Sequence, residues 1–311
     1  MRQHFTFIGL RPRVVKTCKA CNVCRSLKKR FNKYGLVPPK EPQAIPWHTL
    51  CIDLMGPCQW GNKEKGTAFS LTCLTMIDPA TGWFEICEVP NKRADYIVNY
   101  LEQHWLTRYP WPTEIVMDRG TEFCAEVAKA IRDQFGVTKK LITSRNPQAN
   151  SIVERIHQVV GNVLDTRGIT CKADLDEHFG FSGILAAIRH AINALVHATT
   201  RATPSQLVFG RDKLLNVNFV ADWQCIKDCK QRLILQNNKR ENKTRIPHVY
   251  NQGNRVMVKL DPSRKHDGDK YQGPYAVTQV CDNGTVKLSR NTNGGAVYET
   301  WNIRNIDPCL D

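Results

Sequence analysis

The order of apolar patterns between residues 47 and 212 constrains the fold more than any other feature. Three short runs rich in Leu, Ile, Cys, Thr and aromatic residues come first, each bounded by turn-forming pairs such as Gly-Pro, Asp-Pro or Pro-Asn. These runs occupy residues 48–55, 69–77 and 83–89. Two further strand-type runs, 114–117 and 137–142, then alternate with helix-type patterns. Strands followed by alternating strands and helices predict an α/β layer with a mixed sheet.

Apolar residues at spacings of three and four predict four helices in the same segment. The first carries Ala94 to Trp105 and is stopped by prolines, and the second opens at Thr121 and closes at Gly136. The other two carry the apolar positions of 152–164 and 184–195.

Composition changes on both sides of this segment. Residues 1–46 end in the proline-rich stretch from Gly35 to Pro46, which reads as an extended linker. Residues 213–250 are polar and basic, and they read as a connector with some helix. Residues 251–311 contain short alternating strands separated by Asp-Gly, Asn-Gly and Gly-Gly turns, which predict a small all-β barrel of about five strands.

The net charge of +15 is distributed unevenly along the 311 residues. Residues 1–46 carry a net charge of +10, residues 47–212 carry −1, and residues 213–311 carry +6. A neutral centre between basic flanks favours a polyanionic partner that the flanks hold, although solvated surface charge gives the same pattern. No run of about 18 apolar residues occurs, so no ordinary membrane span is expected. The 13 scattered cysteines, without a secretory signal, indicate a reduced intracellular chain.

Three acidic residues stand where the predicted elements converge. Asp53 lies in the first strand, Asp118 ends the fourth strand, and Glu154 lies 36 positions later on a helix. Phosphoryl transfer on DNA uses two divalent cations about 3.5–4 Å apart, and Mg²⁺ takes carboxylate oxygens. Two aspartates on neighbouring strands and a glutamate from a helix suit that requirement. Each acid taken alone also fits a turn, cap or surface position.

Six motifs in this order resemble the integrases of long-terminal-repeat retrotransposons, most closely the gypsy-type (Metaviridae) group of the retroviral integrase superfamily. The motifs are Cys21-Asn-Val-Cys24 with Lys28 and Gly35, Pro46-Trp47…Asp53…Gly56-Pro57, Asp118-Arg-Gly-Thr-Glu-Phe, Asn146-Pro-Gln-Ala-Asn150 through Glu154-Arg-Ile-His157, Thr203-Pro204…Gly210-Arg211, and Gly273-Pro274-Tyr275. Together they cover almost the whole chain.

The resemblance implies a ribonuclease H-like core with a mixed five-stranded sheet and flanking helices over residues 47–212. It also implies a remnant of an N-terminal zinc-binding helical module over 1–46, and a C-terminal barrel of the GPY/F type. The implied activity is that of a polynucleotidyl transferase, a DNA endonuclease of the DDE type. Water attacks near the end of the element's DNA, and the freed 3′-hydroxyl then attacks target DNA. Asp53, Asp118 and Glu154 are the implied catalytic residues and ligands of two Mg²⁺ or Mn²⁺ ions.

A cluster of polar and basic residues near the third acidic motif is the candidate DNA-binding surface. The resemblance places Gln148 and Asn150 close to DNA, and short amides before a helix N-terminus suit phosphate contact. Local turn capping and surface exposure are the alternatives. The candidates are Lys139, Lys140, Arg145, Asn146, Gln148 and Asn150. His157, one turn beyond Glu154, is expected to be a packing or surface residue.

The N-terminal motif departs from the family pattern. A structural Zn²⁺ ion needs four ligands, and the family supplies two histidines upstream of the Cys21 and Cys24 pair. Those histidines are absent, so the Zn²⁺ site is incomplete and the sequence is expected to be N-terminally truncated. Cys18 extends the pair to a Cys-x-x-Cys-x-x-Cys run, which binds zinc only with a fourth ligand.

The leading hypothesis is a polyprotein-derived integrase that performs 3′-end processing and strand transfer. Its expected partners are double-stranded DNA, as element ends and target, and further copies of itself, with no membrane. It is expected to act in the nucleus after a stage in a cytoplasmic particle. One alternative is a decayed or domesticated integrase that only binds DNA, and another is a ribonuclease H-type nuclease on the same fold.

Overall fold

The structure is a computed structural model that describes most of the chain. The described residues are 7–21, 32–61, 66–118, 138–142, 151–176, 183–260, 270–292 and 295–309, with Val127, Lys129, Ile131, Asp133 and Phe135. Within these residues, no helix combines the length and the apolar character needed to cross a membrane.

The chain divides into two compact units. The core unit comprises residues 41–234, and the terminal unit comprises residues 1–40 together with 235–311. Residues from both ends of the chain thus belong to one unit. The four segments predicted from composition, 1–46, 47–212, 213–250 and 251–311, stay a prediction.

A mixed five-stranded sheet forms the centre of the core unit, as expected from the strand pattern. Its order is β4-β3-β2-β5-β6. The strands are β2 (Thr49–Trp60), β3 (Phe69–Ile77), β4 (Phe84–Glu88), β5 (Glu114–Asp118) and β6 (Thr138–Ile142). The β2–β3 and β3–β4 pairs are antiparallel, whereas β2–β5 and β5–β6 are parallel. This arrangement fits a ribonuclease H-like fold.

Strand β2 continues past its expected end. The apolar run predicted a strand ending at Met55, but pairing with β3 resumes at Cys58 and continues to Trp60. A register shift between Met55 and Cys58 takes up the Gly56-Pro57 pair. Because a β-bulge releases the ladder hydrogen bond that proline cannot make, the strand tolerates proline at this point.

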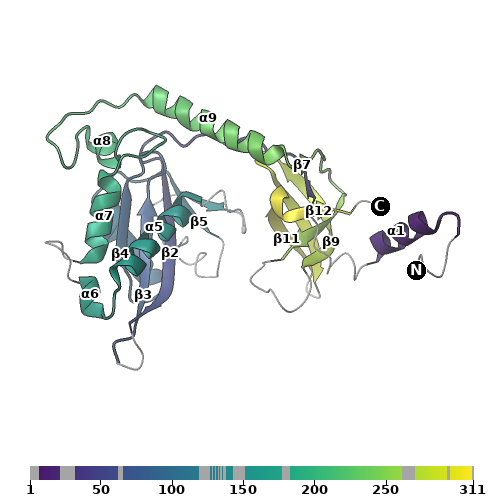
Figure 1. The fold of residues 1–311 in the computed structure, drawn as a ribbon, viewed down its shortest axis with the longest axis horizontal. Coiled ribbons are helices and arrows are strands. Elements are labelled where there is room, and N and C mark those ends of the chain that lie inside the picture. The colour runs from purple at the N-terminus through teal and green to yellow at the C-terminus, as the bar shows by residue number, and fades with distance from the viewer. Residues whose placement is uncertain are drawn as a thin grey trace. The chain divides into compact units, whose positions relative to one another are not determined.

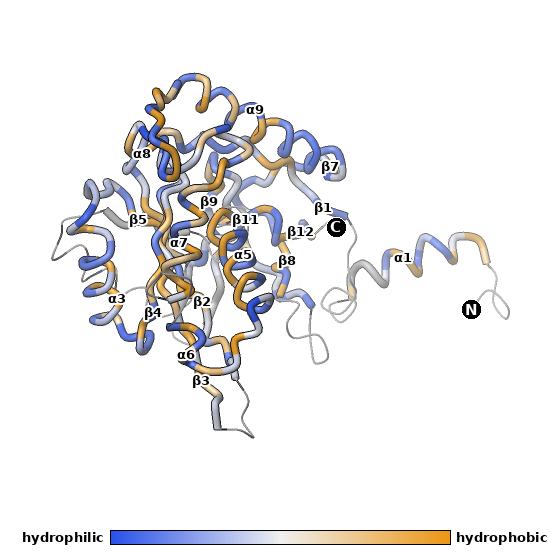
Figure 2. The backbone as a smooth tube through the Cα atoms, turned by 60° about the vertical axis from the view of Figure 1, so that its left-hand side comes forward, coloured by the Kyte–Doolittle hydropathy of each residue, from blue (hydrophilic) through white to orange (hydrophobic). Residues whose placement is uncertain are grey.

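Helices cover both faces of the core sheet. The helix α3 (Ala94–Leu101) continues into one π-helical turn, η1 (Glu102–Leu106), and both pack on one face. The helices α5 (Ser151–Arg167) and α7 (Ile184–Ala194) pack on the other (Figure 1). Figure 2 shows α3 and α5 on opposite sides of the strands. The helix predicted from Thr121 is helical at its described positions, where Val127 and Ile131 are buried.

Alternation along β2 sends side chains to two separate apolar clusters. Leu50 and Ile52 join the cluster beneath α3, while Cys51 and Met55 join the cluster beneath α5 and α7. This is the two-residue period of a strand buried on both faces. Odd-numbered positions in this part of β2 therefore share the α5 face.

The core unit also contains two short helices, α6 (Lys172–Asp176) and α8 (Pro204–Phe209). The helix α8 begins with a capping box, in which the Thr203 hydroxyl accepts from the Gln206 N–H at 3.0 Å. The Gln206 side chain accepts in return from the Thr203 N–H at 2.9 Å. Both hydrogen bonds lie in the Thr203-Pro204 segment, near the predicted C-terminal end of the core domain.

We expect the variant Thr203→Ala to lower the free energy of unfolding of the core unit by about 1 kcal/mol, because it leaves an N-terminal N–H of α8 without its acceptor. Urea unfolding of the full chain measures the change. The variant Thr203→Ser keeps the hydroxyl and should retain most of the stability. Equal losses in the two variants would contradict a capping role.

The terminal unit contains a second, antiparallel sheet with the order β11-β10-β9-β8-β12. Its strands are β8 (Arg255–Lys259), β9 (Tyr271–Cys281), β10 (Thr285–Thr292), β11 (Gly295–Asn302) and β12 (Ile306–Pro308). Val256, Val277 and Leu288 contribute to its core. Five strands agree with the number expected for residues 251–311, and closure of this sheet into a barrel stays a prediction.

Segments from both ends of the chain meet in the terminal unit. The two-residue strand β1 (Lys33–Tyr34) pairs in parallel with β7 (Arg245–Ile246). Beyond β1, the backbone of Val37 exchanges two hydrogen bonds with the Asn242 side chain, at 2.9 and 3.0 Å. The predicted linker from Gly35 to Pro46 thus lacks regular structure, but its first residues are packed. The N-terminal helix is α1 (Leu10–Ala20).

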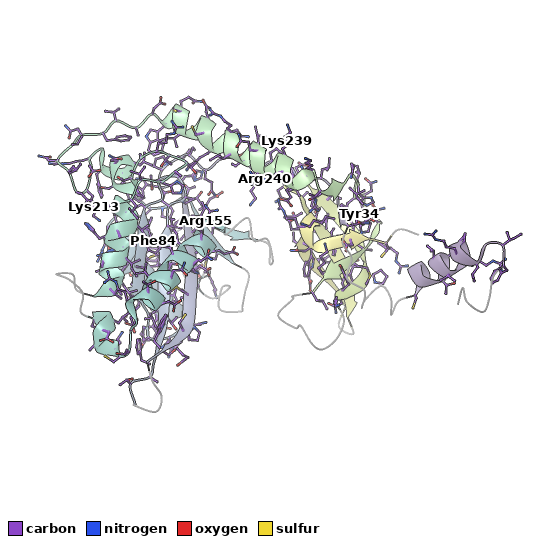
Figure 3. All side chains as sticks on the ribbon, in the orientation of Figure 1. Tyr34, Phe84, Arg155, Lys213, Lys239 and Arg240 are labelled. Carbon is purple, nitrogen blue, oxygen red and sulfur yellow. The ribbon has the colours of Figure 1, made fainter. Side chains whose placement is uncertain are left out.

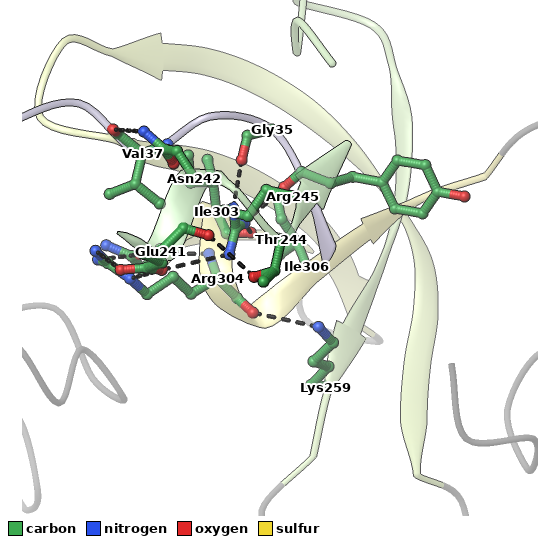
Figure 4. Close-up of polar contacts among 12 residues, drawn as sticks. Gly35, Val37, Glu241, Asn242, Thr244, Arg245, Lys259, Ile303, Arg304 and Ile306 are labelled. Carbon is green, nitrogen blue, oxygen red and sulfur yellow. Dashed lines mark hydrogen bonds and ion pairs between the residues drawn. The ribbon is translucent and has the colours of Figure 1, made fainter. Parts of the chain in front are cut away.

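One buried arginine connects these segments (Figure 4). The Arg245 guanidinium donates to the carbonyl oxygens of Gly35 at 2.5 Å and Tyr34 at 2.6 Å. It also donates to the Ile303 carbonyl at 3.2 Å, from the short helix η2 (Ile303–Asn305). The Arg245 side chain is only 1% exposed, and its nearest carboxylate is Glu241 at 3.5 Å.

Glu241 lies near the end of the long helix α9 (Trp223–Asn242) and binds a second arginine. Arg304 donates to both carboxylate oxygens of Glu241, at 2.7 and 2.8 Å. Figure 4 shows the Arg245 and Arg304 side chains on either side of this carboxylate. A fork-to-fork pair of this kind is among the strong hydrogen-bonded ion pairs in proteins. Since α9 spans Trp223–Asn242, much of the predicted connector 213–250 is a single helix.

Candidate catalytic site

The strands that carry the two candidate aspartates are neighbours in the core sheet. β2 and β5 pair in parallel, with Thr49 opposite Glu114, Leu50 opposite Ile115 and Cys51 opposite Val116. Each pair is separated by 65 positions, and the same offset carried two residues further sets Asp53 against position 118. Neighbouring strands lie about 4.8 Å apart. The register therefore brings the backbone of the two aspartates to adjacent points of the sheet.

The helix that carries Glu154 lies against the same part of the sheet. On α5, Val153, Val160 and Leu164 are buried in the cluster that contains Cys51, Met55 and Val116. Position 53 lies between Cys51 and Met55 on β2, and position 118 lies two residues after Val116 on β5. Since alternate strand positions share a face, both aspartate positions fall on the α5 face.

Glu154 is exposed at the first turn of α5, next to the buried Val153. A carboxylate in the first helical turn interacts favourably with the helix dipole. Arg155 follows it and is also exposed, and Figure 3 shows this side chain on α5. The start of α5 therefore presents one acid and one base to solvent.

A hydrogen-bonded chain joins α5 to the segment of Asp53. Thr75 stands opposite Asp53 in the β2–β3 ladder, and its hydroxyl donates to the Asp53 carbonyl oxygen at 3.0 Å. The same hydroxyl oxygen lies 2.8 Å from Nε2 of His157 on α5. His157 is half-buried, and burial lowers the pKa of its imidazole. It is thus a packed residue, as expected, but it packs through a polar contact.

Thiol chemistry is disfavoured on this face. Burial is the largest cause that raises the pKa of Cys51, two residues before Asp53, to about 12. Burial also raises the pKa of Cys73 on β3. Both side chains remain neutral thiols at physiological pH, and a neutral thiol is a poor nucleophile and metal ligand. The carboxylates are the groups on this face that suit a hard cation.

Several candidate residues lie outside the described part of the chain. The side chain of Asp118 is among them, although its backbone ends β5. The backbones of Lys139 and Lys140 lie on β6, whose side chains are not described. The remaining residues outside it are Arg145, Asn146, Gln148, Asn150 and Cys24. Among the described side chains, which include Cys21 but not Asp118 or Cys24, no group of three His, Cys, Asp or Glu could hold a metal ion.

The chain is similar in sequence to several known proteins. The chain is 22% identical over 269 residues to the retrovirus-related Pol polyprotein from transposon 412 of Drosophila melanogaster, covering 78% of this chain and 21% of that protein. It is 25% identical over 198 residues to gypsy retrotransposon integrase-like protein 1 of Bos taurus, covering 64% of this chain and 36% of that protein. The chain thus spans about a fifth to about a third of these relatives.

These similarities support an integrase of the retroviral and gypsy-type superfamily. Its fold resembles a chain in the structure of a simian T-cell lymphotropic virus intasome in complex with PP2A regulatory subunit B56 gamma. The TM-score is 0.61 at 11% identity, with 100% of this chain and 93% of that chain covered. At this low identity the likeness concerns the fold alone. A family model described as viral polyprotein N-terminal matches residues 53–152, less than half of the chain.

Sequence reasoning alone did not identify two residues of this site. Thr75 lies in an apolar strand, where a single threonine carries no functional signal. Arg155 was visible only as part of a motif, and its exposure beside Glu154 depends on the packing of α5. The cross-strand position of Thr75 opposite Asp53 requires the β2–β3 register, which the sequence does not specify.

Proposed function

We propose that this integrase cleaves and joins DNA ends in a metal-dependent reaction, with Asp53, Asp118 and Glu154 as the catalytic residues. The parallel register of β2 and β5 carries this proposal, because its offset of 65 between Thr49–Cys51 and Glu114–Val116, continued two residues further, sets position 53 against position 118. The packing of α5 on the same face supports the third member. The family in general belongs to the polynucleotidyl transferases, and the two steps are 3′-end processing and strand transfer.

The donor set fits Mg²⁺ or Mn²⁺. Both are hard cations that prefer carboxylate oxygens, and the thiols on the same face are protonated. When bound, two such ions supply an activated oxygen nucleophile and stabilise the leaving oxygen of the phosphodiester. The chain's own part is to hold three carboxylates from two strands and one helix in fixed positions, so that little rearrangement accompanies the reaction.

Basic residues around the site are proposed to hold the DNA backbone. Arg155 adjoins Glu154 on α5, and Lys139 and Lys140 lie on β6, the strand next to β5. Arg145, Asn146, Gln148 and Asn150 precede α5 in the sequence and are proposed to contact the same DNA. Phosphate contacts of this kind position DNA without reading its sequence. The described cations Lys239 and Arg240 project from α9 (Figure 3) and extend the basic character of the terminal unit.

The proposed partners are element ends, target DNA and further copies of the chain. The relatives' names support a retrotransposon origin within a polyprotein, and the fold neighbour comes from an intasome. Action in the nucleus follows from the proposed chromosomal target. Cys21 and Cys24 are proposed as an incomplete Zn²⁺ site that awaits two further ligands.

The test is cleavage of a labelled DNA duplex by the full 311-residue chain in Mg²⁺ or Mn²⁺. We expect strand cleavage that requires the metal and that the variant Glu154→Gln abolishes, because the amide keeps the shape but loses the charge. Asp165→Asn, an exposed acid near the end of the same helix, is the matched control and should cleave normally.

Two outcomes would overturn the proposed reaction. Binding of DNA without metal-dependent cleavage by the unaltered chain would favour the alternative of a protein that only binds DNA. Cleavage that persists in Glu154→Gln at the rate of the control would assign the chemistry to other residues. Preference for the RNA strand of an RNA–DNA hybrid would instead indicate a ribonuclease H-type nuclease.

A further inference from the structure

The contact between His157 and Thr75 joins the helix of one proposed catalytic acid to the strand of another. We propose that His157 is a positioning residue, which acts through Thr75 to fix the carboxylate of Asp53 relative to the first turn of α5. This inference rests on the proposed function of the site, and it assigns a role to a histidine that the sequence alone placed among packing or surface residues.

The hydrogen positions follow from the distances. The Thr75 hydroxyl has a single proton, which it donates to the Asp53 carbonyl oxygen at 3.0 Å. The 2.8 Å contact with His157 must then have Nε2–H as the donor and the hydroxyl oxygen as the acceptor. Neutral His157 is therefore held with its proton on Nε2. A single threonine hydroxyl thereby receives one hydrogen bond from the helix and passes one to the sheet.

The effect reaches the carboxylate through one peptide unit. The carbonyl of Asp53 and the N–H of Leu54 belong to the same planar peptide group. Thr75 holds the oxygen end of this group, and the Leu54 N–H donates to Oδ1 of Asp53 at 2.9 Å. The orientation of the carboxylate thus depends on a peptide plane whose other end is held by Thr75 and His157.

On the helix side, His157 is also close to a proposed catalytic acid. Glu154 and His157 are three residues apart on α5, so their side chains are neighbours on one face of the helix. Val153 and Val160 bury the adjoining stripe, while Glu154 is exposed. His157 lies at the boundary between these two sides, where it is half-buried. A shift of α5 along the sheet would break the 2.8 Å contact before it emptied the apolar cluster.

A packing role and a positioning role make different predictions for substitutions. If His157 only fills space, an apolar side chain of similar size suffices, and an amide offers no advantage. If it positions Asp53, the substitute must donate a hydrogen bond to Thr75. Outer-sphere groups that orient metal ligands contribute about 10- to 100-fold to metal affinity. The variants His157→Leu and His157→Gln separate the two roles.

The experiment measures Mn²⁺ binding to the full chain by the electron paramagnetic resonance of free Mn²⁺, without DNA. We expect the half-saturating Mn²⁺ concentration to rise about tenfold in His157→Leu and in Thr75→Val. His157→Gln should stay within about threefold of the unaltered chain, because its amide N–H can still donate. The double variant should bind no more weakly than the weaker single variant, since both break one chain of contacts.

Two further readings make the result specific. Imidazole ¹⁵N NMR should show His157 with its proton on Nε2 in the unaltered chain, and a tautomer mixture in Thr75→Val. Thr166→Val is the matched control, because Thr166 is exposed on the same helix and its hydroxyl donates to the Asn162 carbonyl oxygen within α5. It should leave Mn²⁺ binding and the His157 tautomer unchanged.

The outcomes distinguish this inference from the function on which it rests. Mn²⁺ binding that Glu154→Gln weakens but His157→Leu does not would overturn the positioning role alone. Failure of His157→Gln to improve on His157→Leu would do the same. Mn²⁺ binding that is absent in the unaltered chain, or indifferent to Glu154→Gln, would overturn the proposed metal site and the inference with it.

Discussion

The variant Asp53→Asn is expected to slow Mg²⁺-dependent DNA cleavage by more than about 100-fold, beyond the range of residues that only orient metal ligands. The change removes one negative charge from the metal-binding set but keeps an oxygen in the position of Oδ1. That oxygen can still accept from the Leu54 N–H, which now lies at 2.9 Å. The local structure should therefore survive while the affinity for the divalent ion falls.

The measurement compares single-turnover cleavage rates over a range of Mg²⁺ concentrations. Asp165→Asn makes the same change of charge at an exposed position of α5. It is the control and should match the unaltered chain. We expect thermal unfolding of Asp53→Asn without metal to occur at or above the temperature of the unaltered chain, since neighbouring carboxylates repel each other. Cleavage within a few-fold of the control would exclude Asp53 from the metal-binding set.

The variant Arg245→Met is expected to destabilise the terminal unit by about 3 to 5 kcal/mol. The methionine fills part of the space but donates to none of the three carbonyl oxygens that Arg245 now satisfies, on Tyr34, Gly35 and Ile303. Since the side chain is 1% exposed, water cannot readily replace those contacts. The strand pair β1–β7 should be the first part of the unit to open.

Hydrogen exchange measured by mass spectrometry reports this opening segment by segment in the full chain. Amides of residues 32–40 and 241–246 should exchange at least about 100-fold faster in Arg245→Met, because each 1.4 kcal/mol corresponds to a factor of ten. Arg240→Met removes an exposed cation from α9 and should leave exchange nearly unchanged. Equal exchange in both variants would show that the buried guanidinium contributes little to this pairing.

Two strongly apolar elements could be predicted from the sequence almost to the residue. The run 69–77 became β3 with the same bounds, and the helix expected over 184–195 became α7, Ile184–Ala194. Each element buries at least one of its faces. Its apolar residues therefore follow the period of a strand or of a helix. The candidate acids were found for a different reason, because they occur in motifs that a family shares.

Elements held by polar contacts were much harder to predict. The helix α9 buries Ile226 among mostly polar residues, so its sequence lacks the apolar stripe that predicts a helix. Arg245 is surrounded in the sequence by other polar residues, and nothing there distinguishes a buried arginine from a surface one. The β1–β7 pair is two residues long and joins distant segments, which no local pattern can indicate.

The joining of both chain ends in one unit has a consequence for the order of folding. Arg245 and the Gly35 carbonyl that it binds are separated by 210 positions. During synthesis, β1 emerges early, but its partner strand appears only after all of residues 41–234 have been made. The strands of the core sheet are all synthesised before the terminal unit can fold. Until then β1 has no partner strand. Translation that stops before residue 245 would therefore release a chain with a complete core sheet and an unmatched N-terminal strand.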